Sequence, residues 1–268
     1  MKGRVLIVAG SDSGGGAGIQ ADIKTVTALG GYAATALTAL TAQNTQGVFG
    51  IHDVPVDFIA QQMTVVLDDI GADCIKTGML HRVEVIERVA AVIESHAAGV
   101  PLVVDPVMVA KGGAALLRPD AVAALTRELV ARATVVTPNL PEAERLTGMT
   151  VATVDDMCAA AQALRERGPA AVLLKGGHLE GDEITDVLAS EDGVQLFRSP
   201  RIDTRHTHGT GCTLASAIAT GLAQELSLVE AVRRARDYVL AAIRAAPGLG
   251  HGHGPLNHAH TFTPGGSR

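Results

Sequence analysis

The chain has 268 residues, of which 47% are hydrophobic and 2% aromatic, and its formal net charge is −6 at pH 7. This length and apolar content suffice for one large core, so we expect a single domain over residues 1–268 with a frayed tail at residues 264–268. An acidic chain with few aromatic side chains has no basic stripe for a phosphate backbone, so nucleic acid is not expected as a partner.

The chain begins with a short apolar run at residues 5–9, which stops at Gly10. A membrane span needs ~20 apolar residues and a secretory leader a longer apolar segment, so this run predicts a buried first strand. The three cysteines, Cys74, Cys158 and Cys212, are far apart and predict free thiols rather than disulfides or a zinc site. We therefore expect a cytoplasmic protein without a membrane partner.

Short aliphatic and β-branched runs recur along the chain and predict buried strands. In chain order these runs are residues 5–9, 35–40, 74–77, 102–104, 134–137 and 171–174. Between them lie stretches in which apolar residues follow helical spacing, such as residues 59–70 and 85–93. Alternating strands and helices predict βαβ units, a mainly parallel sheet with helices on both faces, and ligand sites at the carboxyl ends of the strands.

The parallel pattern is expected to break once. Residues 184–189 and 194–197 flank the turn-rich sequence Ser-Glu-Asp-Gly at 190–193, which predicts a small antiparallel hairpin at an edge of the sheet. A separate glycine-bearing loop, Lys-Gly-Gly at residues 111–113, has two open interpretations: a lid over the site or an ordinary exposed loop.

The strongest local signal is the sequence His-Gly-Thr-Gly-Cys-Thr at residues 208–213, just before a helix with apolar residues at 214, 218 and 222. Glycines permit a tight turn with exposed N–H groups, and a helix start carries partial positive charge. The sequence therefore predicts a phosphate cradle for ATP formed by His208, Gly209, Thr210 and Gly211. A glycine-rich turn that only begins the helix is the alternative.

Two further residues of this region carry candidate catalytic chemistry. Cys212 is expected in the first turn of the helix, where the helix dipole lowers a thiol pKa, and is interpreted as a base or a member of an anion hole. Simple packing of a small buried residue is the alternative. Lys175 follows the predicted strand at 171–174, where its ammonium can neutralise transferring phosphate oxygens, unless it is a solvated surface lysine.

Oxygen-bearing side chains follow two neighbouring predicted strands. Asp105 comes directly after residues 102–104, while Asn139 and Glu142 come after residues 134–137. Two carboxylates and an amide at one sheet edge suit Mg²⁺, which takes a few oxygen ligands and keeps its waters. For the two acids, a role as helix cap or first-turn charge is the alternative.

Two other motifs are weaker. Residues 16–21 fit a loose G-x-G-x-x-A dinucleotide pattern, but no acid follows at the distance of about 20 residues that a ribose contact needs. A Walker A loop is excluded because the chain contains no Gly-Lys dipeptide. The tail histidines at positions 251, 253, 258 and 260 lack the spacing of a metal site and are interpreted as structural or lining residues.

Eight segments taken together resemble, in order and spacing, the hydroxymethylpyrimidine/phosphomethylpyrimidine kinases of the ribokinase superfamily. They span about residues 4–260 and read GSDSGGGAGIQADIKT, TALTAQNT, KTGML, VVDPVM, TPNLPEAE, LLKGGH, THGTGCT and GLGHGHGPLNH. The resemblance implies a three-layer α/β/α ribokinase-like fold, a homodimer, and Mg²⁺ with ATP as phosphoryl donor. It also implies thiamine biosynthesis, through phosphorylation of 4-amino-5-hydroxymethyl-2-methylpyrimidine and then of its monophosphate.

The same resemblance implies roles for individual residues. Gln43 matches the glutamine that reads the amino and ring-nitrogen edge of the pyrimidine, and Asp22 matches an acid near the substrate. The pocket walls match Gly10, Met79 and Val107. Phosphate and metal positions match Lys175, Asp105 and Glu142, and the family's anion-hole cysteine matches Cys212, where wider ribokinase relatives usually carry Asp.

Two other functions compete with this interpretation. A pyridoxal kinase acts on a similar hydroxymethyl group on a flat nitrogen ring, so an assay of both alcohols would separate the two. A non-catalytic nucleotide- or pyrimidine-binding protein is the second alternative, because a fold does not fix a function. Turnover of ATP that depends on the alcohol would exclude it.

Overall fold

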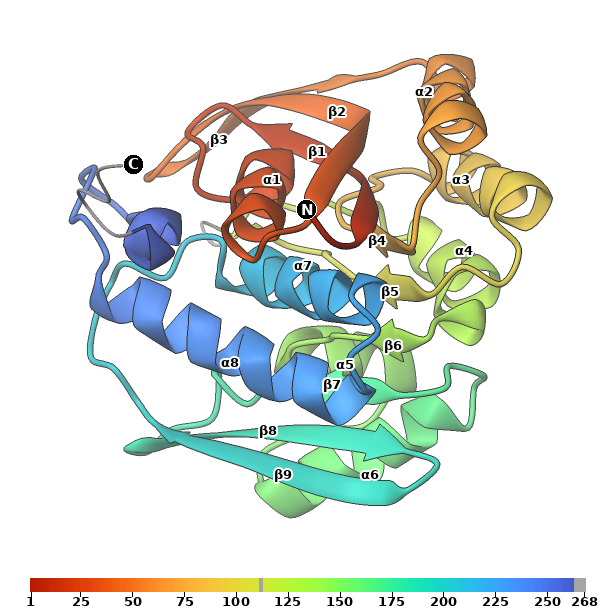
Figure 1. Ribbon diagram of the computed structural model, residues 1–268. Coiled ribbons are helices and arrows are strands. Elements are labelled where there is room, and N and C mark those ends of the chain that lie inside the picture. Colours follow the sequence, from red (N-terminus) through yellow and green to blue (C-terminus); the bar gives the residue numbers. More distant parts are fainter. Residues whose placement is uncertain (111–112, 263–268) are drawn as a thin grey trace.

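The computed structural model describes residues 1–110 and 113–262 (Figure 1). The strands are β1 (Arg4–Asp12), β2 (Tyr32–Asn44), β3 (Gly47–Asp53), β4 (Cys74–Thr77), β5 (Leu102–Val104), β6 (Val135–Val136), β7 (Val172–Leu174), β8 (Glu183–Ser190) and β9 (Gly193–Pro200). The α-helices are α1 (Gly18–Ala28), α2 (Val56–Asp69), α3 (Val83–His96), α4 (Ala121–Glu128), α5 (Leu140–Thr147), α6 (Val154–Arg165), α7 (Thr210–Ala223) and α8 (Leu228–Arg244). Residues 111 and 112 of the proposed lid, and the predicted frayed tail at 264–268, lie outside the described residues.

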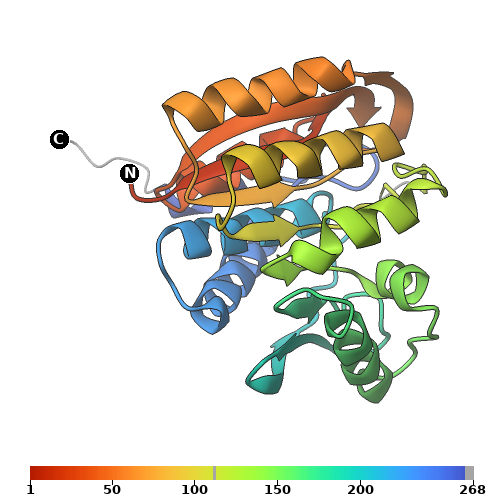
Figure 2. The same ribbon diagram turned by 90° about the vertical axis from the view of Figure 1, so that its right-hand side faces the viewer.

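Strand β1 shows how the sheet is buried on both faces. Successive side chains of a strand point to opposite faces. Leu6 and Val8 belong to one core with helices α2 to α6, while Val5 and Ile7 belong to a second core with α1, α7 and α8. Figure 2 shows α2, α3 and α4 lying across the first face. The predicted three-layer α/β/α architecture is confirmed.

The described strands form one sheet in the order β3-β2-β1-β4-β5-β6-β7-β8-β9. Strands β2, β1, β4, β5, β6 and β7 are parallel, as predicted, and the runs at 74–77 and 102–104 coincide with β4 and β5. The hairpin predicted around residues 190–193 is also confirmed, because β8 pairs antiparallel with β9. This hairpin extends the sheet to its β9 edge.

The expectation of a single antiparallel break is wrong. Strand β3 pairs antiparallel with β2 at the opposite edge of the sheet. Its sequence, Gly-Val-Phe-Gly-Ile-His-Asp, contains two glycines and no fully buried residue, and it lacks the continuous apolar run of a buried strand. Pairing with the long strand β2, rather than local propensity, accounts for this element.

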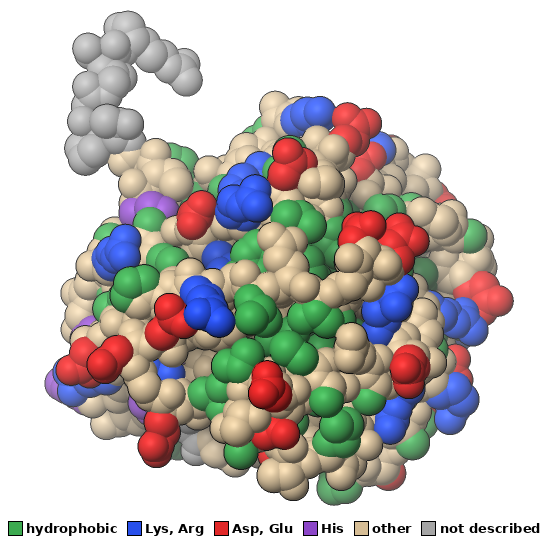
Figure 3. Space-filling model, turned by 90° about the horizontal axis from the view of Figure 1, so that it is seen from below, with side chains coloured by type: hydrophobic (Ala, Val, Ile, Leu, Met, Phe, Trp, Pro, Cys, Tyr) green, Lys and Arg blue, Asp and Glu red, His purple; other side chains and the backbone are tan. Residues whose placement is uncertain are grey.

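The surface beside β9 is chemically mixed. Figure 3 shows that acidic and basic side chains are interspersed among apolar patches on the face seen from below, and neither sign of charge predominates there. Val194 and Leu196 of β9 contribute exposed apolar side chains. None of the described helices is both long and apolar enough to cross a membrane.

Candidate active site

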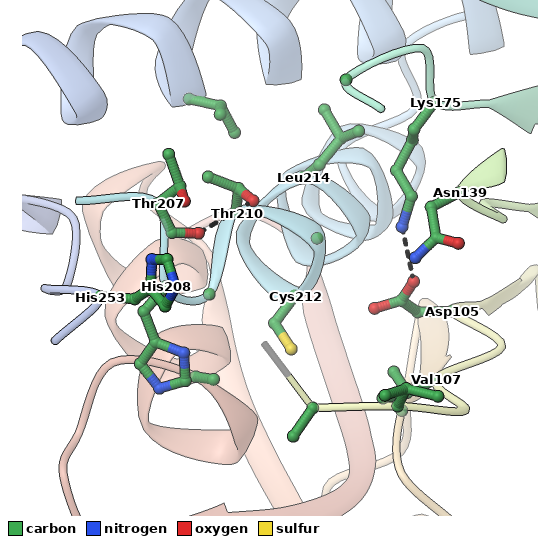
Figure 4. A pocket seen from close by; sticks show the side chains of 18 of the residues that line it. Asp105, Val107, Asn139, Lys175, Thr207, His208, Thr210, Cys212, Leu214 and His253 are labelled. Atoms are coloured by element: carbon green, nitrogen blue, oxygen red, sulfur yellow. Dashed lines mark hydrogen bonds and ion pairs between the residues drawn. The ribbon is translucent and has the colours of Figure 1, made fainter. Parts of the chain in front are cut away.

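A cavity of about 850 Å³ lies at the carboxyl ends of the parallel strands. This volume falls within the range of small-molecule sites, about 300–1,000 Å³. The structure brings nearly all the site residues predicted from the sequence to its lining: Gly10, Gln43, Met79, Asp105, Val107, Asn139, Glu142, Lys175, His208, Gly209, Thr210, Gly211 and Cys212. Figure 4 shows Lys175, Asn139 and Asp105 on one side of the pocket, His208 and His253 on the other, and Cys212 between them.

The start of helix α7 has the geometry of an anion site. Its N-cap residue, Gly209, has φ of 83°, and no side chain caps the helix start. A Cβ on Gly209 would lie 1.8 Å from the carbonyl oxygen of Gly16, so only glycine fits. A Cβ on Gly211 would lie 3.3 Å from Lys175 Nζ. The first turn of α7, which no side chain caps, therefore lies directly beside the lysine ammonium.

Lys175 is held in place by an acidic partner and by the backbone that follows it. Its Nζ donates to Asp105 Oδ1 at 3.1 Å, and the lysine side chain is only 14% exposed. Burial alone would lower the pKa of Lys175, but the charges of Asp105 and Glu142 raise it. Gly176 N–H donates to Asp186 at 2.8 Å, which fixes the end of β7. The geometry excludes the alternative of a solvated surface lysine.

Asn139 and Glu142 serve the helix and line the cavity together. Asn139 Oδ1 accepts from the N–H of Glu142 at 2.9 Å, and Glu142 Oε2 accepts from the N–H of Asn139 at 2.8 Å, which completes a capping box for α5. Burial raises the pKa of Glu142 to about 7, and the charge of Lys175 partly opposes that shift. The first-turn alternative, raised for the two acids, is therefore confirmed for Glu142, which nevertheless lines the cavity.

The expected lowering of the Cys212 pKa is wrong. Burial raises the pKa of this thiol to about 12, although Lys76 lowers it in part. The helix start is present as predicted, but Cys212 is partly buried in the cavity wall, where nearby Asp22 and Asp105 also disfavour a thiolate. At neutral pH the residue is therefore a neutral thiol in the ligand-free protein.

Asp22, assigned to substrate by resemblance, does not line the cavity. It is fully buried, and both its carboxylate oxygens accept from Lys76 Nζ at 2.9 Å, while Ser216 Oγ donates to Oδ1 at 2.7 Å. Lys76 is itself among the lining residues, and sequence reasoning missed it. A lysine inside the apolar run at 74–77 was the available signal, because a buried lysine requires a partner. Asp22 thus lies outside the cavity lining, behind Lys76.

Part of the cavity wall is apolar, and two strand irregularities adjoin the cavity. Met79 is buried in a small cluster with Ala39 and Leu116, against which Val107 packs. The ladder between β1 and β2 shifts register around Gly10, and the ladder between β2 and β3 shifts between Ala42 and Gln43. Such bulges re-aim side chains beside functional sites. They direct the walls and Gln43 into the cavity.

The glycine loop after β1 is filled by the chain itself. Asp12, another residue missed from the sequence, accepts from the N–H groups of Gly14, Gly16 and Ala17 at 2.8, 3.1 and 2.8 Å. His208 Nε2 also lies 2.8 Å from Asp12 Oδ2. Burial would raise the pKa of Asp12, but these partners hold it below its usual range. A carboxylate therefore occupies the position that a dinucleotide phosphate would take.

The tail histidines have different surroundings. His253 lines the cavity, whereas His258 is buried and contacts Thr213 Oγ1 through its Nε2 at 3.0 Å. Burial, together with the charges of Lys24 and His260, lowers the pKa of His258 to about 4. Among the described residues, no group of three or more His, Cys, Asp and Glu side chains is arranged to hold a metal.

Known proteins match nearly the whole chain. Residues 12–257 match the family model of phosphomethylpyrimidine kinase. A hydroxymethylpyrimidine/phosphomethylpyrimidine kinase of Rhizobium meliloti is 50% identical over 96% of this chain and 97% of its own length. The thiamine biosynthesis bifunctional protein ThiED of Geobacter sulfurreducens is 55% identical over 96% of this chain, which spans about half, 52%, of that longer protein.

Solved structures show the same fold. A Bacillus subtilis pyridoxal kinase, solved as an ADP complex, aligns with a TM-score of 0.89 at 37% identity and covers 97% of this chain and 98% of its own. A phosphomethylpyrimidine kinase of Clostridium difficile 630 aligns with a TM-score of 0.81 at 40% identity, over 90% of this chain and 100% of its own. With residues 12–257 matched and half the positions identical to a full-length relative, this chain belongs to the phosphomethylpyrimidine kinase family.

Proposed function

We propose that this kinase transfers a phosphoryl group from ATP to the hydroxymethyl group of 4-amino-5-hydroxymethyl-2-methylpyrimidine and then to the resulting monophosphate, in thiamine biosynthesis. One observation carries the proposal: a single cavity has a phosphate-binding end, formed by the start of α7 and Lys175, and a ring-binding end with Gln43. The names of the relatives supply the substrate class.

The phosphate end supports catalysis by positioning and charge neutralisation. Phosphoryl transfer passes through a loose transition state, so most of the acceleration comes from these two effects. The N–H groups of the first α7 turn would hold the transferring oxygens, and Lys175 would neutralise the charge that develops on them. Because the Cys212 thiol is neutral, its S–H group serves better as a donor in this anion hole than as a base.

The residues present also fit a Mg²⁺ ion. Asp105 and Glu142 are buried carboxylates that lie close enough for the charge of one to raise the pKa of the other. Two protein carboxylates suffice because Mg²⁺ keeps several waters and binds substrate phosphates. Bound there, the ion would neutralise phosphate charge. Its positive charge would also offset the burial that now raises the pKa of Glu142.

The ring end supports recognition of an aminopyrimidine. Thr41 Oγ1 lies 3.1 Å from Gln43 Oε1, which orients the amide. A primary amide offers a donor and an acceptor side by side, and an amino group next to a ring nitrogen presents the matching pair. Met79 and Val107 supply apolar contact for the flat ring. Gln43 is therefore the residue proposed to select the pyrimidine.

A coupled assay of ADP formation tests the proposal. The purified protein is given ATP and Mg²⁺ with the pyrimidine alcohol, its monophosphate or pyridoxal in parallel. We expect turnover that requires an acceptor and is fastest with the two pyrimidines. Equal ATP hydrolysis with and without an acceptor would contradict a kinase function, and a clear preference for pyridoxal would replace the substrate.

Pyridoxal kinase is retained as the second candidate because its solved structures align closely with this chain. A Staphylococcus aureus pyridoxal kinase, in complex with pyridoxal, has a TM-score of 0.90 at 36% identity. The higher sequence identity to pyrimidine kinases, 50% for the Rhizobium meliloti enzyme, favours the pyrimidine.

A homodimer and a cytoplasmic location complete the proposal, both taken over from the family resemblance. Exposed apolar side chains on the β2–β3 edge of the sheet support the homodimer, since Leu40 and Phe49 are 44% and 71% exposed. Sedimentation velocity at several protein concentrations tests it. A monomer at every concentration would contradict it.

A further inference from the structure

The glycine- and histidine-rich segment of residues 250–255, which we call the strap, has no role in the function proposed above. It packs against the turn between β2 and β3. The N–H of His253 donates to Thr45 O at 2.8 Å, and the N–H of Gly252 donates to Thr45 Oγ1 at 3.2 Å. A Cβ on Gly252 would lie 2.0 Å from Thr45 O, and one on Gly250 would lie 2.3 Å from Thr45 Oγ1. This contact is so close that only glycine fits.

The far end of the strap contacts the entry to helix α7. The N–H of His208 donates to the carbonyl of Gly254 at 3.1 Å, and His208 forms an isolated parallel bridge with Pro255. A Cβ on Gly254 would lie 2.2 Å from His206 Nδ1. One six-residue segment therefore joins the β2–β3 turn to the residue that precedes the phosphate-binding glycines.

The His208 side chain also contacts Gln43 and Asp12 at the cavity. Its Nε2 lies 2.8 Å from Asp12 Oδ2 and 3.4 Å from Gln43 Nε2. A Cβ on Gly16 would lie 2.4 Å from His208 Cδ2, so the glycine loop also packs directly on this ring. Figure 4 places His208 and His253 together on the side of the pocket away from Lys175. His208 thus contacts the ring-binding glutamine and the strap at once.

We infer that the strap and His208 hold Gln43 at a fixed position relative to the first turn of α7, and so set the spacing between the ring site and the phosphoryl site. Gln43 lies two residues before Thr45, at a register shift next to the weakly buried strand β3. The strap adds to the local contacts of Gln43, whose carbonyl accepts from Ser13 Oγ and whose N–H donates to the same oxygen, each at 2.8 Å. A 1 Å misplacement of a positioning group can cost about 10²-fold in rate. The strap residues are positioning residues, because they act through Gln43.

The first test compares two glycine substitutions. Gly252→Ala introduces a methyl group against Thr45 O. Gly47→Ala serves as the matched control, because Gly47 follows Thr45 in the β2–β3 hairpin and its added methyl group would meet no atom within 4 Å. Calorimetry measures the Kd of the pyrimidine alcohol and of ADP. We expect Gly252→Ala to weaken pyrimidine binding about tenfold, since such a displacement removes part of the Gln43 contact, and to leave ADP binding within about twofold. Equal behaviour of the two variants would overturn the inference.

A double-mutant cycle then separates positioning from general destabilisation. If the strap acts through Gln43, Gly252→Ala should weaken ring binding by less than about twofold in a Gln43→Leu background, because coupled residues are not additive. A full tenfold loss in that background would overturn the inference. If Gly252→Ala lowers the melting temperature too far for calorimetry, Thr45→Val, which replaces the hydroxyl acceptor by a methyl group, takes its place in the same cycle.

The inference rests on the proposed function in taking Gln43 as the ring-binding residue, and the two can fail separately. Wild-type protein measured with the pyrimidine alcohol and with pyridoxal tests the function alone. If the wild type binds only pyridoxal, the proposed substrate is wrong, and the same cycle is run with pyridoxal. If Gly252→Ala and Gln43→Leu are not coupled in that cycle either, the inferred role of the strap would be wrong.

Discussion

Replacement of Lys175 by Met tests the phosphate end of the site most sharply. The substitution keeps an unbranched apolar side chain that is one atom shorter, and it removes the ammonium. That ammonium lies 3.1 Å from Asp105, whose side chain is only 3% exposed. The change therefore removes a charge aimed at the anion site and leaves a buried carboxylate without its ionic partner.

Two magnitudes follow from these contacts. Breaking a buried ion pair from one side typically costs about 3–5 kcal/mol. Thr137 Oγ1 still donates to Asp105 at 3.2 Å, so we expect the lower end of that range, about 3 kcal/mol. This loss leaves a domain of ordinary stability folded at 25 °C. Removing a preorganised charge from the transition state should lower kcat by about 10²–10³-fold.

The assay pairs steady-state kinetics with thermal unfolding of the same preparation. Lys2→Met is the matched control, since Lys2 pairs with Glu225 on the surface, where both side chains are mostly exposed. We expect that control to change neither kcat nor the melting temperature. A Lys175→Met enzyme with normal kcat and only weakened pyrimidine binding would refute the assignment of the lysine to the transferring phosphate.

Three further changes have defined outcomes. Cys212→Ala should lower kcat yet leave measurable turnover, because its neutral thiol supplies one donor of several; a rate equal to wild type would show that the thiol is incidental. Gln43→Leu should weaken pyrimidine binding by about 1–3 kcal/mol per unpaired buried group in calorimetry, and unchanged affinity would reject the substrate. Burial raises the pKa of Glu142 from 4.5 to about 7, so the folded protein loses stability as pH rises through that interval. Glu142→Gln retains the helix cap and does not titrate. The melting temperature of the variant minus that of the wild type should therefore rise from pH 5 to pH 8. A difference that stays constant with pH would contradict this. Added Mg²⁺ should stabilise the wild type more than Glu142→Gln, and equal stabilisation would exclude Glu142 as a ligand.

The central strands could be predicted because burial on both faces of the sheet requires apolar residues at successive positions. Strands β5 and β7 are buried on both faces, so they read as continuous apolar runs with clear ends. Parallel strands place their carboxyl ends at one edge, which is why Asp105, Asn139 and Lys175 could be expected to meet. Strand β3 has no such apolar run, since its formation depends on pairing with β2.

The interactions that organise the site could not be predicted from local sequence. Lys76 and Asp22 are 54 residues apart, and His208 and Asp12 are 196 residues apart. Nothing in either segment identifies the partner, because such a pairing depends on how α1 and α7 pack on the sheet. The pKa of Cys212 shows the same limit. The helix start was visible in the sequence, but the burial that reverses the shift was not.

The most direct test of the account is a crystal structure with a non-hydrolysable ATP analogue and the pyrimidine alcohol bound together. We predict that the γ-phosphate lies against the first turn of α7 beside Lys175, with the pyrimidine edge on Gln43 and its hydroxymethyl group directed at that phosphate. A triphosphate bound elsewhere, or a ring remote from Gln43, would contradict the assignment of one cavity to both substrates.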